Sequence, residues 1–364
     1  MSSITTYPDA FFPVRGGCGR FTLQGSGNED DNTGYQVFFD GNALTEIEEV
    51  GQGTINVSPD RMVDIARLFR PKIPVLGATA AYEDDEAVKE VYIKYGDITY
   101  DQDNCTSQVN VNTDSDTRKI VNATVQDWEA DIFAANTVEA LTYRPLVMNM
   151  CRNQYEYISI FSPGGSGTVS VVRIDGNGTE TGTVVSLNEG ITVIPIGGKN
   201  HVGGVSLANI VRVEVRVYTG KTFKYFVKDG CCPPDLGQIV FFEPNGGWAV
   251  LKGCPASANI DSSGVEICTE IPCGISGTDR FLYGKQPVSM SGQMNVNIEV
   301  EVPPRPDWAF YLSSFKMSRH RYIVRETLTG DQLVKLNIGS GGIRIFEKEK
   351  VLKAVVSGTI DWVG

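Results

Sequence analysis

Five of the eight cysteines lie within one short stretch of the chain, and thiolates are common metal ligands. They are Cys231, Cys232, Cys254, Cys268 and Cys273; the other three are Cys18, Cys105 and Cys151. Four of the cluster could bind zinc, but it contains no C-x-x-C spacing, and free cysteine is among the residues most often buried. Eight cysteines in 364 residues are too sparse for a disulfide scaffold. We therefore expect reduced structural thiols, with a zinc site or a later disulfide as alternatives.

Four acidic loops carry closely spaced carboxylates, which can wrap a calcium ion. They span residues 28–31, 83–86, 101–104 and 114–116. None completes an EF-hand pattern, and Asp, Asn and Gly are the usual residues of surface turns. We expect these loops to be turns, and we predict no bound metal.

No set of residues has the spacing of a known catalytic site. His201 and His320 are the only histidines, which excludes any mechanism built on several histidines. The glycine-rich segment 162–167 lacks the G-x-S-x-G spacing of a nucleophile elbow, and 339–342 lacks the Lys-Ser/Thr of a phosphate-binding loop. Glycoside cleavage needs only two carboxylates, yet nothing singles out a pair among 44 acidic residues. We predict that the chain is not an enzyme and needs no cofactor.

The one concentrated basic run contains Arg319, Arg321 and Arg325. Alternation along a strand would place these arginines on one face, where they could meet either a phosphate backbone or an acidic protein neighbour. We expect the acidic neighbour. Trp248 follows a turn and is either a sugar-stacking platform or, more commonly, a core and interface anchor. These four residues are the predicted interface residues.

Short runs of alternating apolar and polar residues dominate the chain and predict a mainly β protein. The clearest run places Val211, Val213, Val215 and Val217 on one face of a hairpin over 210–228. Turn residues predict two more hairpins, around 175–178 and across 244–247. Further strands are expected at 86–95, 296–302, 309–312, 322–325, 333–338, 343–346 and 352–362.

One short helix is predicted near residues 59–69. Ser58 suits the N-cap, Pro59 suits the first helical position, and Pro71 ends the run. Apolar residues at i, i+3, i+4 and i+7 give this helix one buried face. They are Met62, Ile65, Ala66 and Phe69.

The formal net charge of −12 is unevenly distributed. Residues 1–150 contain 24 acidic and 11 basic side chains, whereas the rest is nearly neutral. This acidity argues against nucleic acid as the main partner and is compatible with layered assembly.

We expect two or three β-sandwich or barrel domains: an acidic β-rich domain with the helix (1–145), a β-sandwich-like domain (146–235) and a β-rich C-terminal domain (236–364).

No run approaches the roughly 20 apolar residues that span a bilayer, and the N-terminus lacks the basic start and apolar stretch of a secretion signal. We therefore expect that the chain does not insert into a membrane and that it folds in a cytoplasm.

The order of three segments resembles structural proteins of tailed phages that infect Bacteroidetes-type bacteria. The segments are NVSPDRMVDIARLF, FFEPNGGWAVLKG and the closing strand series from Arg325 to the last residue. In layout over most of the chain, they are similar to distal-tail, tail-hub or baseplate components, which are β-sandwich proteins that form closed rings. The resemblance implies a non-enzymatic virion protein, assembled in the host bacterial cytoplasm as a ring of three or six copies that contacts other tail proteins. The alternatives are a receptor- or glycan-binding adhesin and, below it, a glycan-cleaving enzyme.

Overall fold

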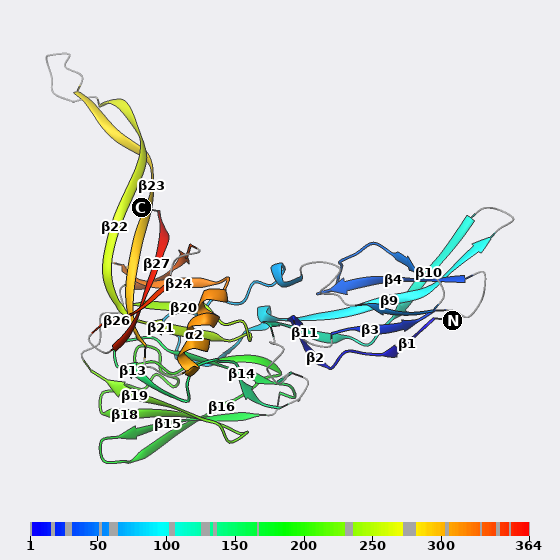
Figure 1. The fold of residues 1–364 in the computed structure, drawn as a ribbon, viewed down its shortest axis with the longest axis horizontal. Coiled ribbons are helices and arrows are strands. Elements are labelled where there is room, and N and C mark those ends of the chain that lie inside the picture. The colour runs from blue at the N-terminus through cyan, green and yellow to red at the C-terminus, as the bar shows by residue number, and fades with distance from the viewer. Residues whose placement is uncertain are drawn as a thin grey trace.

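The computed structural model of this chain is mainly β, as the sequence predicts, and its strands form three lobes (Figure 1). The structure describes residues 2–15, 19–25, 31–50, 53–57, 65–101, 106–124, 132–133, 137–165, 167–229, 236–271, 282–302, 306–327, 330–339, 343–348 and 351–363. Among these residues, no helix is long and apolar enough to cross a membrane.

The N-terminal lobe is a sandwich of two sheets. The smaller sheet has the order β1-β3-β7, and the larger has the order β2-β11-β9-β4-β5, with β10 beside β9 and β6 beside β4. Phe21 and Leu23 of the smaller sheet pack against Val37 and Ile93 of the larger one. The bounds are β1 Ser3–Thr6, β2 Phe11–Arg15, β3 Phe21–Gln24, β4 Asp31–Phe39, β5 Asn42–Ala43, β6 Glu48–Val50, β7 Thr54–Val57, β9 Val88–Asp101, β10 Thr106–Asp114 and β11 Arg118–Thr124.

The middle lobe also contains two sheets, here named the inner sheet (β12-β14-β17-β8) and the outer sheet (β13-β19-β18-β15-β16). The nearly continuous apolar runs YISIFS and GITVIP form β14 and β17, and both strands are buried along their whole length. Ile158 faces the outer sheet, whereas Tyr157 lies in a second core on the opposite face. The bounds are β8 Tyr82–Glu83, β12 Glu139–Ala140, β13 Val147–Cys151, β14 Tyr157–Ser162, β15 Thr168–Asp175, β16 Glu180–Ser186, β17 Gly190–Pro195, β18 Ile210–Val217 and β19 Thr222–Lys228.

The C-terminal lobe is one large sheet with the order β21-β20-β24-β25-β27-β23-β22 and with β26 beside β27. Helix α2 (Pro306–Met317) packs on it, where Tyr311 and Phe315 contact Phe241 of β20. The strand bounds are β20 Gln238–Phe242, β21 Trp248–Lys252, β22 Cys254–Ile271, β23 Leu282–Val302, β24 Arg321–Thr327, β25 Gly330–Asn337, β26 Ile343–Lys348 and β27 Val351–Val363.

The three predicted hairpins are confirmed. They are the antiparallel pairs β18–β19, β15–β16 and β20–β21. Val213, Val215 and Val217 are buried as the alternation requires, although Val211 at the strand end is exposed. Gly178 and Gly246 adopt positive φ angles of 86° and 94° in two of the turns, a conformation that costs glycine little.

The strand expected at 309–312 is wrong, because this segment belongs to α2. Pro306 and Asp307 are favourable at the start of a helix, and the sequence of α2 contains no Val, Ile or Thr. The apolar residues Tyr311 and Phe315 are four apart, so they lie on one helical face. The short apolar run alone did not distinguish a buried helix from a strand.

The helix predicted at 59–69 lies largely outside the described residues. Its last part is the 3-10 turn η1 (Ile65–Arg67), and Ile65 and Phe69 are buried in the N-terminal lobe. The strand expected at 86–95 is β9, which begins at Val88 after the 3-10 turn η2 (Asp85–Ala87).

The expectation of reduced thiols is wrong at two positions, since Cys151 and Cys254 are disulfide-bonded. Cysteine density averages over the chain and does not show which cysteines the fold brings close together. Cys231, Cys232, Cys268 and Cys273 lie outside the residues whose side chains the structure describes.

Apart from β8, the sheets group strands that are near each other in the chain, but the apolar cores run across these groups. The N-terminal sheets use residues 3–124, and the C-terminal sheet uses residues 238–363. One apolar cluster spans the middle and C-terminal lobes. A second joins Phe11 of the N-terminal lobe to Phe161 and Trp248.

Candidate assembly surface

Strands β22 and β23 form a long hairpin, here named the arm, that extends away from the rest of the molecule (Figure 1). Their register runs from Cys254 opposite Glu299 to Ile271 opposite Leu282. Strand β27 pairs with β23 along the base of the arm and ends where Val363 lies opposite Ser291. Among the described strands, residues 264–271 and 282–290 pair only with each other, and we name them the outer arm.

The base of the arm is anchored in the core. Met294, Val296, Ile298 and Val300 are buried at alternate positions, as the sequence pattern predicts. No third strand of the described part of the chain pairs with the outer arm, and eight residues of strand extend roughly 26 Å. Two-stranded hairpins are marginally stable in water unless a third strand or another surface packs on them. The outer arm therefore fits a surface that another molecule completes.

Strand β22 is also the last strand in the order of its sheet. An edge strand offers its backbone N–H and C=O groups to a further strand, which is a common route to association between chains. The sequence pattern does not indicate β22. Its run ASANIDSSG is rich in the Ser, Asn, Asp and Gly that favour turns, and Pro255 is unfavourable inside a sheet.

The structure does not bring the three predicted interface arginines onto one free face. Arg319 is exposed and precedes β24. Arg321 donates hydrogen bonds to the carbonyl oxygens of Phe315 (2.9 Å) and Lys316 (2.5 Å), where a cation stabilises the C-terminus of α2. The Arg325 guanidinium lies 4.0 Å from the sulfur of Met294.

Trp248 is a core residue of the chain, with 1% of its surface exposed. Its indole Nε1–H donates to Asp84 Oδ2 at 3.1 Å, and its backbone N–H donates to Ser159 Oγ at 2.8 Å. Burial raises the pKa of Asp84 to about 6, although hydrogen bonds from Lys72 and Trp248 act in the opposite direction. Trp248 thus joins β21 to the segment that precedes β9.

A network of buried charges holds the middle and C-terminal lobes together. Glu156 accepts a hydrogen bond from Arg144 Nη1 at 2.5 Å and forms an ion pair with Lys252 through its other oxygen. Glu243 lies nearby, and its Oε1 accepts hydrogen bonds from the Tyr143 N–H (3.2 Å) and from Ser314 Oγ (3.4 Å). The Arg144 guanidinium also lies over the ring of Tyr311 at 5.8 Å.

Burial raises the pKa of Glu243 to about 7, against an ordinary value of 4.5, and the nearby Arg144 only partly offsets this effect. The folded chain therefore binds a proton that the unfolded chain releases between pH 4.5 and 7, so stability falls as pH rises through this window. For Glu243→Gln we expect this contribution, at most about 3 kcal/mol, to disappear. The difference between wild type and variant in free energy of urea unfolding, measured from pH 4.5 to 8, tests this prediction. A difference that is constant with pH would contradict it.

The acidic loops that the structure describes use their carboxylates within the chain. Asp84 binds Trp248, whereas Glu86 pairs with Lys89 at 3.0 Å and Asp116 with Arg118 at 3.6 Å. Across the described residues, no group of three His, Cys, Asp or Glu side chains is placed to hold a metal ion. The loops at 28–31 and 101–104 lie mostly outside these residues.

The two histidines occupy different environments. His201 is buried, and its Nδ1 lies 3.0 Å from the Ile196 carbonyl oxygen. His320 is partly buried beside Phe242 and lines a surface pocket with Arg319.

Comparison with known proteins gives no relative to guide the assignment. No protein-family model matches the chain, and no curated protein matches it in sequence.

Proposed function

We propose that this chain is a non-enzymatic structural protein of a phage virion, a tail or baseplate component that acts through interfaces between copies. The observation that carries the proposal is the arm. Its outer part is a two-stranded ribbon with an open edge, and such a ribbon gains stability when a neighbouring molecule packs on it or adds a strand.

The charge distribution supports an assembly in which unlike lobes meet. Residues 1–150 carry most of the negative charge, while Arg319 is exposed on the C-terminal lobe. An acidic lobe of one copy that faces a less acidic lobe of the next would favour a head-to-tail ring, in which each interface joins different surfaces. We propose a ring of three or six copies, which contacts other tail proteins.

Cys151 and Cys254 each take part in a disulfide bond, which also fits a protein that leaves the cell in a particle. Disulfides persist on virion surfaces and in other oxidising environments, whereas they are rare in the cytosol. The chain would assemble with reduced cysteines in the host cytoplasm, and the disulfides would form after the particle is released.

The proposal is tested by the mass of the purified full chain in solution. Light scattering over a concentration series is expected to give the mass of three or six copies, and electron micrographs of the same fractions are expected to show closed rings. A monomer at every concentration would contradict the proposed self-assembly. Binding of that monomer to a glycan array would instead favour the adhesin.

A further inference from the structure

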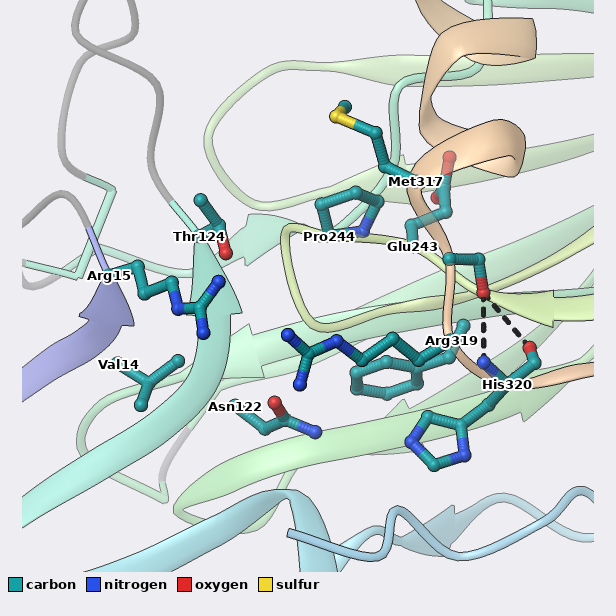
Figure 2. A pocket seen from close by; sticks show the side chains of 11 residues that line it. Val14, Arg15, Asn122, Thr124, Glu243, Pro244, Met317, Arg319 and His320 are labelled. Atoms are coloured by element: carbon teal, nitrogen blue, oxygen red, sulfur yellow. Dashed lines mark hydrogen bonds between the residues drawn. The ribbon is translucent and has the colours of Figure 1, made fainter. Parts of the chain in front are cut away.

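A surface pocket of about 320 Å³ lies at the junction between the N-terminal and C-terminal lobes (Figure 2). Four separate parts of the chain line it, namely the end of β2, the end of β11, the end of β20 with the turn that follows it, and the end of α2 with the segment that follows it. Its volume falls in the range of small-molecule sites, which starts at roughly 300 Å³.

The walls of the pocket are held by hydrogen bonds within the chain. The Thr124 N–H donates to the Pro244 carbonyl oxygen at 2.6 Å, and the Phe242 N–H donates to the His320 carbonyl oxygen at 3.0 Å. Ser318 Oγ bonds to the backbone of His320 on both sides, as donor to its carbonyl oxygen and as acceptor from its N–H. Arg319 therefore extends from a fixed backbone, and a pre-formed site loses little entropy when a ligand binds.

Two guanidinium groups face the interior from opposite walls. Figure 2 shows the side chains of Arg15 and Arg319 pointing toward each other, with the amide of Asn122 below them and the hydroxyl of Thr124 nearby. Arg319 makes no ion pair with any residue that the structure describes, so its charge is available to a ligand. Guanidinium groups bind phosphate and other oxyanions through paired N–H donors.

The other walls are apolar. Val14, Pro244 and Met317 line the pocket together with Phe242, and about half of the Met317 surface is exposed. The single acidic residue in the lining is Glu243, and burial raises its pKa to about 7, so this carboxyl is largely neutral in mildly acidic solution. An apolar wall beside convergent cationic groups suits a ligand that has an apolar part and an anionic group.

We propose that this pocket binds a small organic phosphate, whose anionic group lies between Arg15 and Arg319 and whose apolar part contacts Met317. The site lies apart from the arm, because none of its lining residues belongs to β22 or β23.

The test uses the full chain at pH 6, with isothermal titration calorimetry of phenyl phosphate, inorganic phosphate and phenol as probes. Phenyl phosphate is expected to bind more tightly than inorganic phosphate, and phenol is expected not to bind. Arg319→Gln and Arg15→Gln should each weaken both phosphates by roughly 10- to 100-fold, the effect of losing one charged hydrogen-bond donor. Met317→Ala should weaken phenyl phosphate alone.

Lys224→Gln is the matched control, because Lys224 is an exposed cation on β19 in the outer sheet of the middle lobe. It should leave the binding of both phosphates unchanged, and circular dichroism verifies that every variant is folded. The proposal is overturned if neither phosphate binds at millimolar concentration, or if the arginine variants bind as well as wild type. Equal responses to phosphate, sulfate and chloride would also overturn it, because they would indicate an adventitious ion only.

Discussion

Shortening the arm is expected to convert the assembled protein into a folded monomer. The variant replaces residues 264–290 with Asn-Gly, which joins Ser263 to Ser291, the pair that lies opposite in the register. Asn-Gly favours the tight turn of a two-residue hairpin. Because β27 pairs with β23 as far as Ser291, the variant removes the outer arm and the residues that connect its two strands, and it keeps the three-stranded base. Light scattering gives the mass, and circular dichroism tests the fold.

The β9–β10 hairpin provides a matched control. Replacing residues 100–107 with Asn-Gly joins Thr99 to Gln108, which also lie opposite each other, and Thr99 stays paired with Asp31 of β4. This variant is expected to assemble much like wild type, because it leaves the arm intact and removes only two of the 24 acidic side chains of residues 1–150. If the arm variant formed the same oligomer as wild type, the arm would not be the assembly element.

The second large effect is expected for Glu156→Gln, which should lower the free energy of unfolding by about 3–5 kcal/mol. Glu156 is fully buried, and its two carboxylate oxygens face the cations of Arg144 and Lys252. A glutamine leaves both buried cations without their counter-charge, and the low dielectric of the interior makes that costly. Urea unfolding at pH 8 measures the loss.

Glu180→Gln is the control for this measurement. Glu180 also pairs with an arginine, Arg216, at 2.8 Å, but the two side chains are 50% and 40% exposed to solvent. Exposed ion pairs contribute about 1 kcal/mol or less, so this variant should unfold almost like wild type. Similar losses for the two variants would mean that burial does not set the strength of the Glu156 network.

The sequence predicts those parts of the fold in which local pattern and tertiary environment agree. The alternating valines of β18 and the turn at Gly178 specify hairpins from neighbouring residues alone. Helix α2 was missed because Tyr311 and Phe315 are buried apolar residues in a short segment, for which strand and helix patterns look alike.

The candidate sites were predicted less well, because they depend on residues that are far apart in the chain. Arg15 and Arg319 meet only where the end of β2 approaches the segment after α2. The basic run points to Arg319, whereas no local pattern points to Arg15. The ribbon of β22 was missed because its Ser, Asn and Gly residues favour turns, and its long pairing with β23 overrides that preference.

The inner sheet of the middle lobe has a consequence for how the molecule loses its structure. Strands β14 and β17 contribute to both apolar clusters, one shared with the C-terminal lobe and one that reaches Phe11 and Val121 of the N-terminal lobe. Neither the N-terminal lobe nor the C-terminal lobe can separate from the inner sheet without exposing apolar side chains to water. We therefore expect the three lobes to unfold together, and we expect the packing of all three lobes to resist a force applied to the arm.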